Sequence, residues 1–382
     1  MRILLAAKTM GVGGLERIVV GLARELSARQ HDVWVVSSGG NLVKDLERFA
    51  RHVQAPLEPV GVAQSARIIR RVILEQHIDL VHSFSATASV AINLAFLKAR
   101  GDGKVRLVSS PMGLQNSPRE LPVTTWLRNW LLIRGAEQVL VISPEIRRHL
   151  KAVGARDELL VDFNFVGLDV ADFTRQPSDG PGVRREFGFP EDALVVSTIG
   201  ALHPRKSHEL FIDTAATVAS TEPRARFLIV GDGDLRDDLE EYARGRKLHS
   251  RLAFTGNRED VARLLSATDV YVKPGVLEGF IGITVLEALS LGKPVVAFDT
   301  EDVKMALTDG ETGLIVPAGD VAALADRILY LLRNPAVGKQ LGQAGQQLVM
   351  EEFDFSVLAR RLEDFYQDVL GRASRRKYAT VE

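Results

Sequence analysis

The chain has 382 residues, enough for two domains, and its 46% hydrophobic and 25% charged residues are typical of a globular protein. This composition excludes a disordered, collagen-like or coiled-coil chain. The absence of cysteine excludes disulfides, thiolate metal sites and cysteine nucleophiles. Because no apolar run reaches 18 residues, we expect no membrane-spanning helix. We expect a cytoplasmic protein without a signal peptide.

A net charge of −1 hides an asymmetry along the chain. Residues 1–167 hold 22 Lys and Arg against 15 Asp and Glu, whereas residues 168–382 hold 26 against 34. A basic first half indicates a surface that faces something anionic, such as a phospholipid membrane, nucleic acid or a phosphorylated acceptor. The alternative is a chance scatter of surface charge.

Short β-rich runs alternate with longer helical patterns along nearly the whole length. The first series of strands is predicted at 2–7, 32–37, 79–82, 105–109 and 138–142, and the second at 194–199, 226–230, 252–255, 269–273 and 294–298. Helices are predicted at 14–30, 64–77, 87–100, 206–219, 234–247 and 320–333. This alternation predicts an α/β protein with two doubly wound domains, each with a mostly parallel sheet.

The segment 174–192 separates the two series and is rich in Gly, Pro and charge, as is typical of a linker. Ligands of doubly wound sheets bind outside the carboxyl ends of the strands. We therefore expect the two domains to direct their loops into a common cleft.

Glycines follow the first predicted strand and lie where backbone N–H groups could approach a phosphate: Gly11, Gly13 and Gly14. The dinucleotide fingerprint requires a third glycine at position 16, where the chain has Glu16, so a nicotinamide site is not expected. The alternative is a turn whose glycines only permit positive φ. Gly231 and Gly233, after a later strand, leave the same two interpretations open.

A stronger signal follows the strand at 194–199. Arg205 and Lys206 lie just after Gly200, where a helix is predicted to start. A helix start is an electrostatically poor place for cations, which favours a functional role over a solvated basic pair. A guanidinium and an ammonium side by side suit a diphosphate.

The segment 268–300 contains a strand, a Gly-containing loop with Glu278, and a helix that is predicted to begin near 282–284. Glu287 is then expected in the second or third turn of that helix. Free N–H groups at the helix start could bind phosphate while the two carboxylates hold sugar hydroxyls. The alternative is one carboxylate that stabilises the helix dipole and one exposed glutamate.

These segments occur in the order found in family-4 retaining glycosyltransferases of the GT-B fold, which the chain resembles over almost its full length. The segments are Gly13-Gly14-Leu15-Glu16, Asp79-Leu80-Val81-His82, 165–169, Gly256-Asn257, Glu278-Gly279-Phe280, Leu286-Glu287-Ala288, Gly292-Lys293-Pro294-Val295-Val296 and Asp309-Gly310-Glu311-Thr312-Gly313-Leu314. The resemblance implies an acceptor-binding domain of residues 1–170 with a returning C-terminal segment, 355–382. It implies a nucleotide-sugar-binding domain of residues 171–354.

The resemblance also implies a role for individual residues. Arg205 and Lys206 would neutralise the departing diphosphate and Glu278 would lie near the transferred sugar; these three are the expected catalytic residues. Donor binding would further involve Gly13, Gly14, Gly231, Asn257, Gly282, Ile283, Thr284, Val285 and Glu287, of which Glu287 would hold the ribose. Acceptor binding would involve Glu16, His82, Ser110 and Met112. No metal and no other cofactor are implied.

Two positions depart from the family pattern. Eight residues separate Glu278 from Glu287 where the family usually has seven, and we interpret Ile281 as an extra loop residue. Many members also carry a histidine near the transferred sugar, in the region that here contains Ser110 and Met112. A serine or the backbone is expected to take its place.

The resulting expectation is transfer of a hexose from a nucleoside diphosphate sugar, with retention, to a cell-envelope glycan or glycolipid such as a lipopolysaccharide or polysaccharide. Trp126, Trp130 and the basic helix around Arg67, Arg70 and Arg71 could rest peripherally on an anionic membrane; the alternative is a core helix with its tryptophans inward. Nucleic-acid binding is not expected. The alternative function is a catalytically weak homologue that binds nucleotide sugar as a partner subunit or scaffold.

Overall fold

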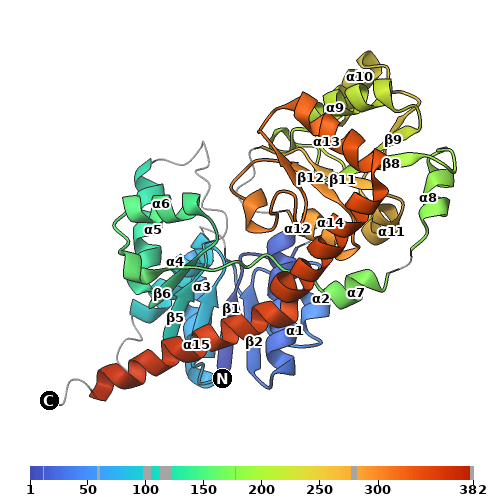
Figure 1. Ribbon diagram of the computed structural model, residues 1–382. Coiled ribbons are helices and arrows are strands. Elements are labelled where there is room, and N and C mark those ends of the chain that lie inside the picture. The colour runs from blue at the N-terminus through green and yellow to red at the C-terminus, as the bar shows by residue number, and fades with distance from the viewer. Residues whose placement is uncertain are drawn as a thin grey trace. The chain divides into compact units, whose positions relative to one another are not determined.

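The computed structural model describes residues 1–11, 13–57, 61–97, 105–111, 122–176, 178–276 and 282–378. The chain forms two compact units: unit 1 is Met1–Val166 with Phe355–Glu382, and unit 2 is Gly167–Asp354 (Figure 1). The division falls four residues before the expected boundary, because Leu168 N donates to Phe353 O (2.9 Å) and Leu168 forms a β-bridge with Asp354. The segment expected as a linker begins at the last residue of α7 (Val170–Thr174) and contains α8 (Gly180–Glu186), and both helices belong to unit 2.

Unit 1 is built on a parallel sheet whose described strands have the order β3-β2-β1-β4-β5-β6-β7. Their bounds are β1 (Arg2–Ala6), β2 (Asp32–Ser37), β3 (Arg51–Gln54), β4 (Leu80–Ser83), β5 (Arg106–Ser109), β6 (Gln138–Val141) and β7 (Leu160–Asp162). Ile3 in the central strand pairs with Val33 on one side and Leu80 on the other. The strand order reverses between β1 and β4, so the loops that follow these two strands diverge there.

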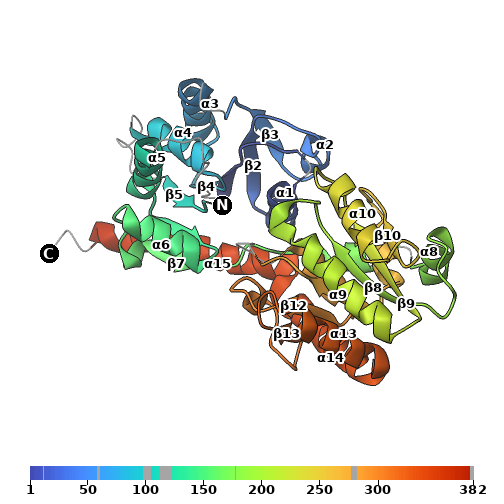
Figure 2. The same cartoon turned by 90° about the horizontal axis from the view of Figure 1, so that it is seen from above.

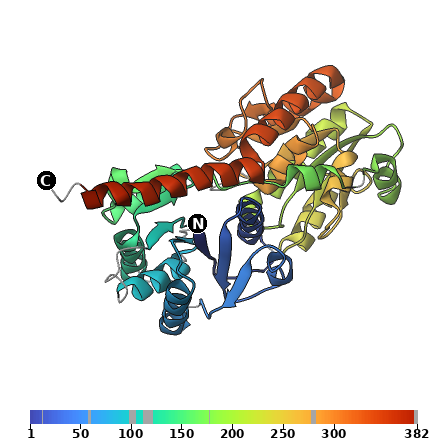
Figure 3. The same cartoon turned by 90° about the horizontal axis from the view of Figure 1, so that it is seen from below.

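Helices cover both faces of this sheet. They are α1 (Gly14–Ala28), α2 (Val43–Leu46), α3 (Val62–Glu75), α4 (Ala86–Leu97), α5 (Pro122–Gly135), α6 (Pro144–Ala152) and α15 (Phe355–Tyr378). Ile3 and Leu5 face α1, α6 and α15, whereas Leu4 and Ala6 face α3 and α4. Figures 2 and 3 show α15 along the side of the sheet opposite α3. Alternate residues of one buried strand therefore belong to two cores.

Unit 2 repeats the plan with strands in the order β10-β9-β8-β11-β12-β13, all parallel in the described residues. Their bounds are β8 (Leu194–Ile199), β9 (Ala225–Val230), β10 (Leu252–Phe254), β11 (Val270–Lys273), β12 (Val295–Phe298) and β13 (Leu314–Val316). The remaining helices are α9 (His208–Thr221), α10 (Arg236–Gly245), α11 (Val261–Ser266), α12 (Ile283–Ser290), α13 (Val321–Arg333) and α14 (Pro335–Leu348). The strand order reverses between β8 and β11.

The predicted fold class is confirmed, since both units are doubly wound α/β structures with parallel sheets. All the predicted strands are present within one or two residues. Three short strands were missed: β3, β7 and β13. Each lies at an edge of its sheet, where a strand pairs with a single neighbour and its sequence carries no strong hydrophobic pattern.

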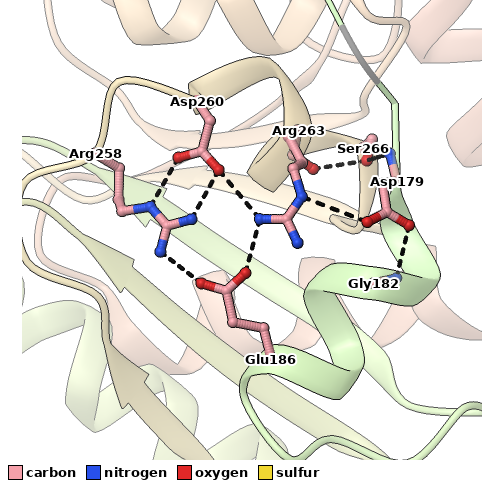
Figure 4. Close-up of polar contacts among 7 residues, drawn as sticks. All are labelled: Asp179, Gly182, Glu186, Arg258, Asp260, Arg263 and Ser266. Atoms are coloured by element: carbon pink, nitrogen blue, oxygen red, sulfur yellow. Dashed lines mark hydrogen bonds and ion pairs between the residues drawn. The ribbon is translucent and has the colours of Figure 1, made fainter.

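An ion-pair network attaches α8 to α11 and to the loop before it (Figure 4). Glu186 accepts from Arg258 (2.6 Å) and from Arg263 (2.7 Å), and Asp260 accepts from both arginines at 2.7 to 3.1 Å. Hydrogen bonds from Arg258 lower the pKa of Asp260 to about 2 and also lower the pKa of Glu186. The network therefore fixes α8, which lies in the segment that the sequence predicted to be a linker.

Candidate functional site

Unit 2 has a pocket at its topological switch point, between the carboxyl ends of β8 and β11 and the start of α12. This is where an open parallel sheet presents diverging loops and where its ligands bind. The pocket is lined by Thr198, Ile199, Lys206, His208, Tyr271, Lys273, Pro274, Gly282, Thr284 and Val285. Four of the expected donor-site residues, Lys206, Gly282, Thr284 and Val285, therefore meet at one place.

The loop after β8 carries Arg205 and Lys206 on a short 3-10 turn, Pro204–Lys206, and α9 begins only at His208. His203 Nδ1 accepts from the Arg205 N–H (3.3 Å), and His208 Nε2 donates to the Ala201 carbonyl (3.2 Å). These hydrogen bonds stabilise the conformation of the loop after β8, so both histidines have a structural role here. The Arg205 side chain is exposed, whereas Lys206 is half-buried and turned into the pocket.

The side chain of Lys206 extends over Gly200 toward the start of α12. A methyl group placed on Gly200 would lie 3.4 Å from Lys206 Cδ, and one placed on Gly282 would lie 4.0 Å from Lys206 Nζ. The ammonium group is thus next to the N-cap residue of α12, Gly282. A cation and the positive end of a helix dipole at one point favour a bound anion.

The first turn of α12 is held to the sheet by Thr284 and lines the pocket together with the N-cap residue Gly282. Thr284 Oγ1 accepts from Tyr271 Oη (2.8 Å) and donates to the Ile199 carbonyl (3.3 Å). Val285 N donates to Gly282 O (3.0 Å). The N–H groups of Ile283 and Thr284 belong to the first turn, where an α-helix has no carbonyl of its own to accept them.

The predicted helix start near 282–284 is confirmed, and Glu287 is the fifth residue of α12, in its second turn. Glu287 is 5% exposed in a largely buried helix, which is unusual for a carboxylate. Its expected contact with a ribose stays a prediction. Glu278 and Met112 lie outside the described residues.

Gly231 lies on the loop after β9, beside the loop that carries Arg205 and Lys206, and Asn257 lies on the next loop along, after β10. Gly231 has φ of +138° and touches the Gly200 carbonyl so closely that a Cβ would overlap the oxygen. Its N–H donates to Gly256 O (3.0 Å), and Asn257 is the exposed residue that follows. Gly231 therefore shapes the loop after β8 by close backbone packing.

In unit 1, Glu16 bends back over the glycine turn that precedes α1. Gly13 is the N-cap residue of α1, followed by Gly14, and Thr9 Oγ1 donates to Glu16 Oε1 (2.8 Å). A Cβ on Gly13 would overlap Glu16 Oε2. The carboxylate thus occupies the positive end of α1 in this structure, which is where the sequence indicated a phosphate contact.

His82 and Ser110, expected to contact the acceptor, belong to a buried hydrogen-bond network in unit 1. His82 Nδ1 lies 2.5 Å from Tyr366 Oη on α15, and His82 Nε2 lies 2.6 Å from Ser110 Oγ. All three residues are fully buried. Burial lowers the pKa of His82 to about 3, so the imidazole is neutral at physiological pH. Sequence reasoning did not single out Tyr366, which lies 284 positions from His82.

Within the ranges that the structure covers, no group of three or more His, Asp or Glu residues is arranged to hold a metal ion. No helix in the same ranges is long and apolar enough to cross a membrane.

Comparison with known proteins agrees with this architecture. Residues 12–168 match the family model "Glycosyltransferase Family 4", and residues 193–334 match "Glycosyl transferases group 1". A GDP-mannose-dependent monoacylated alpha-(1-6)-phosphatidylinositol monomannoside mannosyltransferase of Corynebacterium glutamicum is 28% identical over 84% of this chain and 83% of its own. A phosphatidyl-myo-inositol mannosyltransferase of Mycobacterium leprae is 35% identical over 50% of this chain and 51% of its own.

Among solved structures, Alr3699/HepE of Anabaena, in complex with UDP, superposes with a TM-score of 0.81. It is 22% identical, and the superposition covers 96% of this chain and all of the other. The two parallel-sheet units and these matches define a glycosyltransferase of the GT-B fold. The chain belongs to glycosyltransferase family 4.

Proposed function

We propose that the chain transfers a hexose from a nucleoside diphosphate sugar to a glycan or glycolipid of the cell envelope, with retention at the anomeric carbon. The observation that carries the donor proposal is the Lys206 ammonium beside the N-terminus of α12. Two relatives support the donor class: one is named as GDP-mannose-dependent, and another is solved with UDP.

In this proposal, charge on the chain replaces a metal at the departing diphosphate. Lys206 and the N–H groups of Ile283 and Thr284 bind phosphate oxygens, and the exposed Arg205 closes over them. Fixed positive charge stabilises the transition state because negative charge develops on the leaving group. Glu287 binds the ribose, and Glu278 lies near the sugar. Retention requires the acceptor to approach the face that the diphosphate leaves.

For the acceptor, we propose a lipid-linked molecule reached from an anionic membrane surface. A groove between α3 and α4 of unit 1 has an apolar floor and an arginine rim, and is lined by Ala63, Ala66, Arg67, Arg70, Arg71, Leu74, Glu75, Leu94 and Ala95. Leu74 and Leu94 are exposed by 47% and 36%, which suits contact with acyl chains.

A second exposed feature of unit 1 supports the same membrane proposal. Trp126, which is 49% exposed, stacks on Trp130 with ring centres 6.1 Å apart, and Arg134 lies over Trp130. Tryptophan beside arginine is typical of surfaces at the lipid headgroup level. The test is sedimentation of the chain with anionic liposomes at low salt, with neutral liposomes as the control. If the chain does not pellet with the anionic liposomes, the membrane proposal is wrong.

The donor proposal is tested by the thermal stability of the chain with UDP, GDP, ADP, CMP and dTDP. A nucleotide at 100 times its Kd should stabilise the wild-type chain by about 2.7 kcal/mol. The double variant Arg205→Ala/Lys206→Ala should lose this shift and keep the melting temperature of the unliganded chain. If no nucleotide shifts the wild-type chain, the donor proposal fails. The scaffold alternative is not favoured, because these relatives are named as transferases.

A further inference from the structure

We infer that Lys273 is a positioning residue of the donor pocket: it clamps together the loops that follow β11 and β12 and so holds one wall of the diphosphate site. This inference rests on the proposed function. Nothing in the sequence pattern pointed to Lys273, which ends a buried strand.

The clamp consists of one ammonium group and two oxygen partners from different loops. Lys273 Nζ lies 2.9 Å from Asp302 Oδ2, which belongs to the loop after β12. The same nitrogen donates to the Gly275 carbonyl (3.0 Å), in the turn after β11. The side chains of Lys273 and Asp302 are only 4% and 1% exposed. Neighbouring strands of the sheet thus have their carboxyl-end loops joined through a single buried cation.

Lys273 and Asp302 are both buried, so each charge depends on the other for its neutralisation. Lys273 and Asp302 form an ion pair, and neither Asp302 oxygen accepts a hydrogen bond from the residues that the structure describes. A buried pair of this kind seldom adds net stability, because desolvation of two charges offsets their attraction. The ion pair is better explained as a constraint on the positions of the loops after β11 and β12.

The loop positions that this ion pair holds form part of the wall of the pocket. Lys273 and Pro274 line it at the end of β11, while Gly282, Thr284 and Val285 line it at the start of α12. Tyr271, two residues before Lys273 on β11, donates to Thr284 Oγ1 and so joins the same strand to the first turn of α12. A shift of the turn at Gly275 would therefore alter the space in which Lys206 and the α12 N–H groups meet the diphosphate. Binding sites depend on positions held within about 0.5 Å.

The test separates stability from donor affinity. Lys273→Met alone leaves a buried carboxylate without its cation and is expected to destabilise the chain. The double variant Lys273→Met/Asp302→Leu replaces the ion pair by apolar side chains, so the unliganded chain should recover a melting temperature close to that of the wild type. Its Kd for UDP or GDP, whichever stabilises the wild-type chain, should nevertheless rise by about tenfold or more, because the pocket wall is no longer clamped.

Lys293→Met is the matched control. Lys293 is a half-buried lysine of unit 2 that also donates to a backbone carbonyl, Ser266 O (3.2 Å), but it is not among the residues that line the pocket. This variant should lose stability and bind the nucleotide as the wild-type chain does. If the double variant binds the nucleotide with wild-type affinity, Lys273 has no positioning role. If only ADP, CMP or dTDP stabilises the wild-type chain, the same comparison of variants is made with that nucleotide. If none of the five nucleotides stabilises it, the donor proposal itself fails, and this inference with it.

Discussion

The ammonium group of Lys206 lies beside Gly282, the N-cap residue of α12, although 76 positions separate the two residues in the chain. A Cβ on Gly282 would lie 4.0 Å from Nζ and 3.5 Å from Thr284 Oγ1, which is ordinary van der Waals contact. There is therefore room for a side chain at position 282, and with glycine there the same space is open to a ligand. Gly282 has φ of −65° and ψ of 137°, a conformation that other residues adopt freely.

This relationship predicts that Gly282→Asp abolishes nucleotide binding without harming the fold. Asp is a favourable N-cap residue and should stabilise α12 by roughly a few tenths of a kcal/mol relative to Gly. Its carboxylate would also pair with Lys206 and repel the diphosphate. Melting temperatures with and without nucleotide check both effects.

Gly282→Asn is the control for that substitution, because Asn caps a helix equally well without adding charge. It should keep a larger part of the nucleotide-dependent shift than Gly282→Asp does. Equal shifts for the two variants would mean that charge at this position is irrelevant.

Gly231→Ala should destabilise unit 2 strongly. The Cβ would overlap the Gly200 carbonyl oxygen at a backbone φ of +138°, so the loops after β8 and β9 would have to separate. We expect a loss of about 2–4 kcal/mol in the free energy of unfolding, measured by urea denaturation. Gly245→Ala, at the end of α10 where a Cβ meets nothing within 4 Å, should leave stability unchanged or raise it. Similar effects for both glycines would contradict the packing argument.

The network in Figure 4 predicts that the stability of unit 2 depends on acid pH. Glu186 and Asp260 have lower pKa values in the folded chain than when unfolded. The unfolded chain therefore binds more protons as pH falls, so the stabilisation present above about pH 4.5 decreases toward the folded pKa values. Glu186→Gln should cost about 1 kcal/mol at pH 7, since these side chains are about one-third exposed and partly screened.

The difference between wild type and Glu186→Gln should accordingly shrink when unfolding is measured at pH 5, 4 and 3. Glu191→Gln, which changes an exposed glutamate of the same unit, should match the wild type throughout. A difference that stays constant with pH would show that ionisation of Glu186 does not stabilise the fold.

His82 predicts a pH effect of its own in unit 1. Its folded pKa is about 3 and its unfolded value 6.5, so the unfolded chain gains a proton that the buried imidazole does not. Stability should fall as pH drops below 6.5, by at most about 1.4 kcal/mol per pH unit from this group. His82→Gln should flatten that part of the pH profile. Tyr366→Phe should lower stability at every pH yet keep the slope, because His82 remains buried.

The sequence alone determined the architecture. Buried strands such as 194–199 and amphipathic helices such as 14–28 carry strong periodic patterns, so their order predicted two doubly wound units. The start of α12 and the place of Arg205 and Lys206 followed from glycines and charges at strand ends. Local signals suffice there because parallel sheets always collect the carboxyl ends of their strands at one edge.

Short edge strands and the linker escaped that reasoning. The strand Arg51–Gln54 has no apolar alternation and forms because β2 offers a free edge of backbone N–H and C=O groups. The segment 178–186 has a linker's composition, yet α8 is held by Arg258 and Arg263, more than 70 positions away. The composition of a segment indicates only its local structural tendency, whereas the contacts that hold α8 come from residues that are distant in the sequence.

Side-chain partners within the sites were decided by the tertiary structure alone. Tyr366 reaches His82 only because α15 returns to the sheet of unit 1, and Lys273 meets Asp302 only because β11 and β12 are neighbours. Glu16 folds over Gly13 instead of facing outward. Periodicity encodes which face of an element is buried, whereas the partner of a buried polar group depends on distances between elements that no local pattern records.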